Sequence, residues 1–128
     1  MKRCVESVRA LKPTSAVICD TGSTDGTVGL NRALLKQTLG FFTDNGVVLS
    51  HKWERFGHNR TIALEACIKK VYYGGMVWAF MINADDTVEV TDYDRLVDTL
   101  YTITEDAVNV DIISDSVCFS RPHLFRVV

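Results

Sequence analysis

Two adjacent carboxylates, Asp85 and Asp86, directly follow the most apolar run of the chain, residues 77–82. A short unbroken apolar run is typical of a strand buried on both faces, and ligands of open α/β sheets bind just beyond the carboxyl ends of the strands. Neighbouring carboxylates repel each other, and a cation such as Mg²⁺ or Mn²⁺ relieves that repulsion while it carries a diphosphate. The same residues also suit a turn before a helix, so this segment alone leaves both interpretations open.

A second polar segment, residues 20–27, has the sequence Asp-Thr-Gly-Ser-Thr-Asp-Gly-Thr. Asp20 ends a short apolar strand, and the small residues after it, such as Gly22, let a ligand approach the backbone just before a new helix. That arrangement favours a nucleotide-sized site. The segment matches neither the Gly-Lys-Ser/Thr phosphate loop nor GxGxxG, and it lacks the oxygen ligands of an EF-hand. A tight turn between strand and helix is the alternative.

A third segment, residues 53–61, combines aromatic rings with basic side chains and an Asn-Arg pair at the start of a predicted helix. Asn59 and Arg60 could hold a diphosphate there, because a guanidinium reaches phosphate oxygens in bidentate fashion. The alternative is structural: aromatic rings in the core, Arg55 and Arg60 in solvent, and His58 as a local hydrogen-bonding group.

Length and composition are those of one globular domain over residues 1–128, with 47% hydrophobic and 23% charged residues. The net charge of −2 gives no broad basic surface that would indicate nucleic acid or an anionic membrane as a partner. The longest apolar run, residues 76–82, is too short to cross a membrane. The four cysteines form no CxxC pair, and they suit the reduced interior of a cytoplasmic protein without a zinc site.

Strand and helix patterns alternate along the chain, which predicts an α/β domain with a parallel sheet and helices on both faces. Thr91 and Asp94 form a capping box for one of the helices, and Asp115 lies in a predicted turn. The other expected elements are a helix over 2–11, a strand over 15–20, a helix from Thr24 or Asp25 to Gly40, a strand over 47–49 after the turn at Asp44, a helix over 59–72 broken by Gly74 and Gly75, a strand over 77–82 and short strands over 108–128. In the helix that ends at Gly40, apolar residues recur at helical spacing at Leu30, Ala33 and Leu34.

In this order and spacing the three polar segments resemble the family 2 glycosyltransferases, inverting enzymes of the GT-A fold. The resemblance rests on residues 17–27, on Trp53 with residues 56–64, and on residues 80–86, and it covers nearly the whole chain. Residues 120–126 look like a later segment of some members. It implies a three-layer α/β/α GT-A domain, Rossmann-like, with a mostly parallel sheet.

The resemblance also implies roles for individual residues. The donor would be a nucleotide-sugar, UDP- or GDP-linked, with Mg²⁺ or Mn²⁺ bridging its diphosphate, and the sugar would pass with inversion to an acceptor hydroxyl. The implied site residues are Asp20 at the nucleobase, Gly22 beside it, Asn59 and Arg60 along the donor, Asn83 at the ribose, and Asp85 with Asp86 at the cation.

The sequence departs from the family pattern in three respects. Asn83 stands where the usual acidic pair has its first Asp, which lowers the local negative charge. The family's first strand and its usual general base have no clear counterpart, although Asp111 and Asp115 are candidates for the base. We therefore expect a domain truncated at both ends, either an active transferase or an inactive relative that serves as a binding or scaffold module. A nucleotidyltransferase fits less well, because it would need a basic, glycine-rich loop near the N-terminus.

Overall fold

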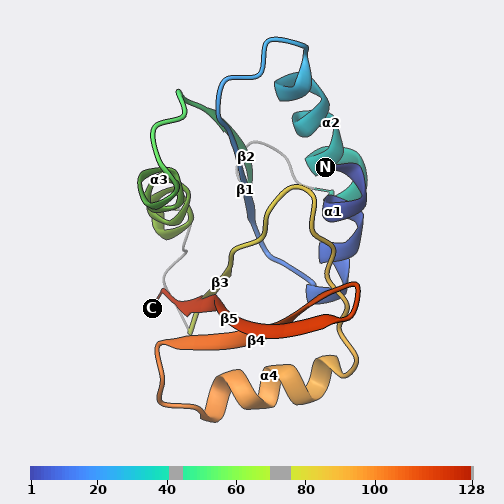
Figure 1. The fold of residues 1–128 in the computed structure, drawn as a ribbon, viewed down its shortest axis with the longest axis vertical. Coiled ribbons are helices and arrows are strands. Elements are labelled where there is room, and N and C mark those ends of the chain that lie inside the picture. The colour runs from blue at the N-terminus through green and yellow to red at the C-terminus, as the bar shows by residue number, and fades with distance from the viewer. Residues whose placement is uncertain (41–44, 70–75, 128) are drawn as a thin grey trace. The chain divides into compact units, whose positions relative to one another are not determined.

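The computed structural model describes residues 1–40, 45–69 and 76–127 (Figure 1). The chain divides into two compact units, the first formed by Met1–Val71 and Ala84–Thr91 and the second by Tyr72–Asn83 and Asp92–Val128. Each unit has a sheet of its own. Parts of three expected features, the helix end at 70–72, the glycine pair Gly74-Gly75 and the turn residue Asp44, lie outside the described residues.

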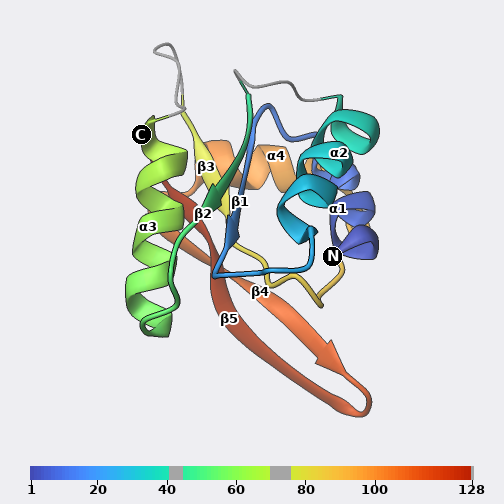
Figure 2. The same cartoon turned by 90° about the horizontal axis from the view of Figure 1, so that it is seen from above.

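The first unit is built on two parallel strands, β1 (Ala16–Asp20) and β2 (Gly46–Ser50). Their register pairs Ala16 with Gly46 and Asp20 with Ser50, so both strands end at the same edge. The helices of this unit are α1 (Lys2–Ser7), the 3₁₀ turn η1 (Val8–Leu11), α2 (Thr27–Leu39) and α3 (Phe56–Lys69). Figures 1 and 2 show α1 and α2 on one side of the strands and α3 on the other. The predicted parallel pairing with helices on both faces is confirmed within this unit.

Helix α2 differs from its expected form at its start and on its buried face. Its N-cap residue is Gly26, which has a left-handed φ of 81°, and no side chain caps the helix at that position. The Asp25 carboxylate nevertheless accepts a hydrogen bond from the Thr27 N–H at 3.3 Å. Gly40 ends the helix as predicted, with φ 70°. The helix buries Leu34 and Leu35, whereas Leu30, expected on the same apolar face, is 58% exposed.

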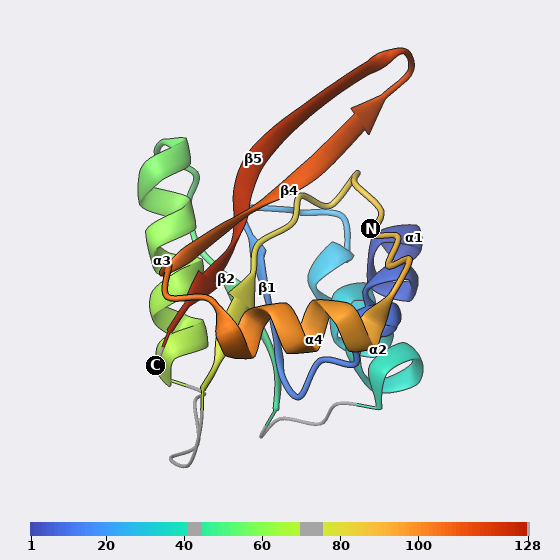
Figure 3. The ribbon, with the colours of Figure 1, turned by 90° about the horizontal axis from the view of Figure 1, so that it is seen from below.

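The second unit contains β3 (Trp78–Phe80), α4 (Tyr93–Thr102), β4 (Ala107–Ser114) and β5 (Val117–Arg126). Its strand order is β3-β5-β4, and both pairings are antiparallel. Figure 3 shows β4 and β5 as a two-stranded ribbon closed by a tight turn. Only Asp115 and Ser116 connect them, and Asp115 takes a left-handed φ of 50°, which Asp tolerates. Such a short connection permits only an antiparallel pair, since parallel strands need a long crossover.

The expectation of a mostly parallel sheet is therefore wrong for the described residues, which contain one parallel and two antiparallel pairings. The apolar run of residues 77–82 forms a strand only over Trp78–Phe80. In the described part of the chain that strand bonds to β5 alone, instead of lying between two parallel neighbours. The side chains of β3 pack within the second unit. Ala79 is 9% exposed, and the Arg126 guanidinium of β5 lies 5.2 Å from the centre of the Trp78 ring.

Helix α4 is capped by Asp92 and not by the predicted Thr91. The Asp92 side chain accepts a hydrogen bond from the Arg95 N–H at 3.0 Å. The capping residue is thus one position later than expected, so Asp94 falls within the first turn, where an acidic side chain favours the helix dipole.

Substitution of the two candidate caps distinguishes between them. We expect Asp92→Ala to lower the free energy of unfolding by about 1 kcal/mol, since the Arg95 N–H loses its acceptor. Thr91→Ala, the matched control, should have little effect. Urea unfolding followed by circular dichroism measures both, and a larger loss for the Thr91 variant would contradict the observed cap.

Candidate functional site

Asp20 ends β1 and holds the turn that follows it. One carboxylate oxygen accepts hydrogen bonds from the N–H groups of Gly22 at 3.1 Å and Ser23 at 2.9 Å. The residue is 6% exposed, and hydrogen bonds from the Ser23 hydroxyl and N–H, helped by the Gly22 N–H and the Ser50 hydroxyl, lower the pKa of its carboxyl. Gly22 has φ 113°, a conformation that suits glycine. These residues form the expected tight turn, and their contact with a nucleobase stays a prediction.

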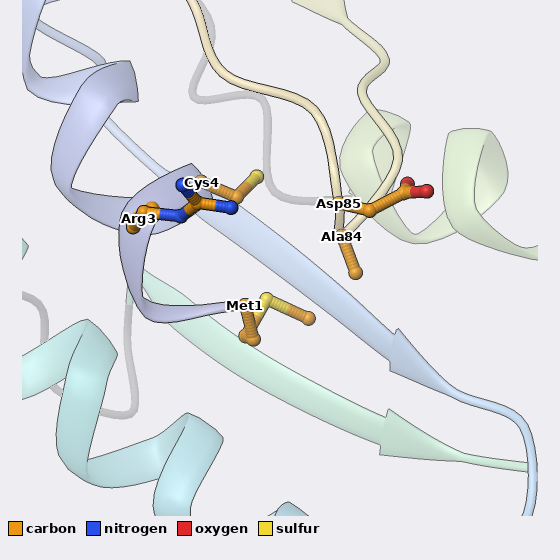
Figure 4. A pocket seen from close by; sticks show the side chains of 5 residues that line it. All are labelled: Met1, Arg3, Cys4, Ala84 and Asp85. Atoms are coloured by element: carbon orange, nitrogen blue, oxygen red, sulfur yellow. The ribbon is translucent and has the colours of Figure 1, made fainter.

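The carboxylates Asp85 and Asp86 lie beside α1 in the first unit. The Val88 N–H donates to the Ser7 hydroxyl at 2.9 Å, which ties residues 84–91 to that helix. A cavity of about 310 Å³ lies between the N-terminal residues and the segment 84–91, and it is lined by Met1, Arg3, Cys4, Ala84 and Asp85 (Figure 4). Burial raises the pKa of the Cys4 thiol, and the negative charges of Asp86 and Asp85 raise it further. Both carboxylates are therefore close to this cavity.

The lining of this cavity holds one carboxylate, that of Asp85, and Asp86 is the next residue along the chain. Mg²⁺ is usually held by one or two carboxylates together with the phosphates of a substrate. Within residues 1–40, 45–69 and 76–127 no group of three or more His, Cys, Asp or Glu side chains could hold a metal by itself. Figure 4 shows the Asp85 carboxylate directed away from Arg3, which leaves the two charges separate. A cation here would need oxygen ligands from its substrate or from water.

Asn59 lies in the first turns of α3 with its side chain buried. The residue is 8% exposed, and among the described residues neither its oxygen nor its nitrogen has a hydrogen-bond partner. A buried group without a partner costs about 1–3 kcal/mol, so this amide is a candidate for contact with a ligand or water. Figure 2 shows α3 beginning on the same side as the carboxyl ends of β1 and β2. Arg60, the next residue, is exposed.

His51, which the sequence analysis does not single out, lies directly after β2. Its N–H donates to the Asp20 carbonyl oxygen at 2.9 Å, which extends the ladder between the strands beyond its last pair. Its Nδ1 is 3.2 Å from the Lys52 carbonyl oxygen, and its Nε2 is buried without a partner in the described part of the chain. The signal that could have found it is its place, a titratable residue directly after a strand at the ligand-binding edge.

The remaining candidates belong to the second unit. Asn83 is the last residue of its first segment, whereas the other predicted site residues belong to the first unit. Asp111 and Asp115, the candidates for a general base, both lie in the β4–β5 hairpin. Asp111 accepts a hydrogen bond from the Ser120 hydroxyl at 2.6 Å, and Asp115 forms the turn. Both have structural explanations there.

Comparison with known proteins decides the family. A model of the family described as Glycosyl transferase family 2 matches residues 1–126. The chain belongs to this family. The match confirms the resemblance found in the three segments, and the family's general chemistry is glycosyl transfer. Neither the curated proteins nor the solved structures gave a match. No helix among the described residues is long and apolar enough to span a membrane.

The pH dependence of stability tests the hydrogen bonds of Asp20. Its folded-state pKa lies below the ordinary value, so its stabilisation is present above the unfolded-state pKa of about 3.9 and is lost as the pH falls through the folded-state pKa. We expect Asp20→Asn to lower the melting temperature at pH 7, with the difference shrinking below about pH 4. Glu65→Gln, an exposed carboxylate on α3, is the control. A deficit for the Asp20 variant that persists unchanged at low pH would disprove this role.

The free amide of Asn59 gives a prediction that separates folding from binding. We expect Asn59→Leu to keep or raise the melting temperature, since it removes two unsatisfied buried groups worth about 1–3 kcal/mol each. If Mn²⁺ with UDP or GDP raises the melting temperature of the unmodified chain, the same variant should lose that shift. Asn31→Leu, at another buried amide of the first unit, should keep that shift. If the Asn59 variant retains the full shift, the amide does not contact the ligand.

Proposed function

We propose that the chain binds a nucleoside diphosphate sugar with Mg²⁺ or Mn²⁺ and transfers the sugar, with inversion, to an acceptor hydroxyl. The observation that carries this proposal is the pair Asp85 and Asp86 beside a cavity of about 310 Å³ in a chain that family 2 matches over residues 1–126. That volume is at the low end for small-molecule sites, so it has room for part of such a donor.

In this proposal the carboxylates of Asp85 and Asp86 hold the cation on the open side of the cavity. Bound there, the cation would neutralise the charge that develops on the departing nucleoside diphosphate. Arg3 lines the same cavity, and its guanidinium offers a second positive charge to a phosphate group. The residues that hold the leaving group thus come from α1 and from the segment 84–91.

The nucleoside end of the donor is assigned to the carboxyl edge of β1 and β2. Asp20 and Gly22 shape the turn there, and Asn59 offers a free amide oxygen and a free amide nitrogen. An amide can pair with the edge of a base or with a ribose hydroxyl. Arg60, the residue after Asn59 on α3, completes the proposed set within the first unit.

The proposal extends to the fold and its setting. It assigns residues 1–128 to one domain of three-layer α/β/α GT-A type, supported by family membership and by the parallel β1–β2 pair between its helices. It also assigns the chain to the cytoplasm, in keeping with its four free cysteines.

A second candidate function is that of an inactive relative that binds a nucleotide without transfer. The observation in its favour is that Asp111 and Asp115, the candidates for the general base, are used by the hairpin. Donor binding is common to both functions. Turnover separates them, since release of UDP or GDP from the corresponding nucleotide-sugar requires the chemical step.

Thermal unfolding with Mn²⁺ and a panel of nucleoside diphosphates tests donor binding. A ligand at 100 times its dissociation constant adds about 2.7 kcal/mol of stability, which gives a clear upward shift. We expect Asp85→Asn to abolish the shift, because the cation loses a charged ligand. Glu89→Gln, an exposed acid four residues later, is the matched control and should keep it. Equal shifts in both variants, or no shift in the unmodified chain, would refute the proposed site.

A further inference from the structure

The loop that enters α3 (Figure 2) and the first residue of that helix carry two exposed aromatic rings, those of Trp53 and Phe56. Trp53 is 45% exposed and Phe56 is 71% exposed, and their rings meet edge to face with centroids 5.0 Å apart. Every residue from 52 to 57 is exposed. Two large apolar rings held together in water are costly to hydrate, so an exposed pair of this kind is a sign of an interaction site.

Positive charges without acidic partners stand beside these rings in the same segment. Lys52 and Arg55 are both exposed, and neither forms an ion pair within the described ranges. The acid of the segment, Glu54, is instead 3.5 Å from the His58 ring nitrogen. The segment therefore presents a local positive charge on a chain whose net charge is −2.

We propose that residues 52–57 form a contact site for the surface of an anionic lipid bilayer. Trp and Phe rings are suited to the boundary between headgroups and acyl chains, where one side is apolar and the other is wet. Lys and Arg beside them attract acidic headgroups, and each cation close to such a surface raises the binding constant about fivefold. The site lies in the first unit and is independent of the proposed donor site.

The observations favour a bilayer over a nucleic acid. Sites for single-stranded nucleic acids combine a long basic groove with several stacking rings, whereas this segment has one ring pair and two cations. Two rings and two cations form a small interfacial anchor. Such an anchor gives weak, reversible and salt-sensitive binding.

Sedimentation with lipid vesicles tests the proposal on the full chain. We expect binding to vesicles of phosphatidylcholine with 30% phosphatidylserine, about tenfold or more above binding to phosphatidylcholine alone, and a decrease with added salt. Tryptophan emission should shift to shorter wavelength with the acidic vesicles. Trp53→Phe keeps an apolar ring, so most of the binding should remain. The emission shift should disappear, because the other tryptophan, Trp78, is not part of the proposed site.

Two double variants separate rings from charges. Trp53→Ser with Phe56→Ser, and Lys52→Gln with Arg55→Gln, should each weaken binding to acidic vesicles at least tenfold. The ring control is Tyr101→Ser, at a side chain that is 67% exposed on α4. The charge control is Arg9→Gln with Arg32→Gln, which removes the same charge from other exposed positions of the first unit. Circular dichroism establishes that each variant is folded.

Several outcomes would overturn the proposal. They are no sedimentation with acidic vesicles, equal binding to both vesicle types, and control variants that weaken binding as much as the loop variants. Tight binding of single-stranded oligonucleotides that depends on the same four residues, with no vesicle binding, would reassign the loop to nucleic acid and reject the bilayer.

Discussion

The parallel pairing of β1 with β2 is the constraint on which the rest of the first unit depends. It brings the ends of both strands to one edge, where the Asp20 carbonyl oxygen accepts a hydrogen bond from the His51 N–H. Beyond that edge, the path of the chain after β1 and its path after β2 are each set by the residues that directly follow the strand. The Asp20 carboxylate holds the turn that leads into α2, and the exposed loop after His51 leads into α3. Residues far apart in sequence, Asp20 and Asn59, thereby reach the same side of the strands.

Asp20 and Asn59 are both buried polar side chains, but they differ in whether their polar atoms have hydrogen-bond partners. The Asp20 carboxylate has its acceptors filled by N–H and hydroxyl groups, and this lowers its pKa. The Asn59 amide is as well buried but has no partner for either of its atoms among the described residues. A satisfied polar group stabilises the fold, whereas an unsatisfied one costs stability and is retained only if something else needs it. On this argument Asn59 is better placed for a ligand than Asp20.

Local patterns in the sequence predicted the helices, the β1–β2 pair and the turn at Asp115. They failed where the structure of an element depends on which other element it packs against or pairs with. The run 77–82 is apolar enough for a central parallel strand, but its neighbour is β5, whose direction follows from the short turn after Ser114. Leu30 has the right spacing for the core, yet α2 turns Leu34 and Leu35 inward. The cap at Asp92 and the buried Nε2 of His51 depend on backbone geometry that spacing does not encode.

The small number of ligands beside the cavity shapes how the proposed donor would bind. Asp85 and Asp86 are too few to enclose a divalent cation, and the described residues supply no third acid or imidazole to complete a cluster. The diphosphate oxygens would have to complete the coordination sphere. Cation and diphosphate then each increase the affinity of the other, and by linkage the two increases are equal. A site of this kind would bind its metal tightly only with the donor present, so release of the nucleoside diphosphate would also release the cation and leave the cavity open for another donor.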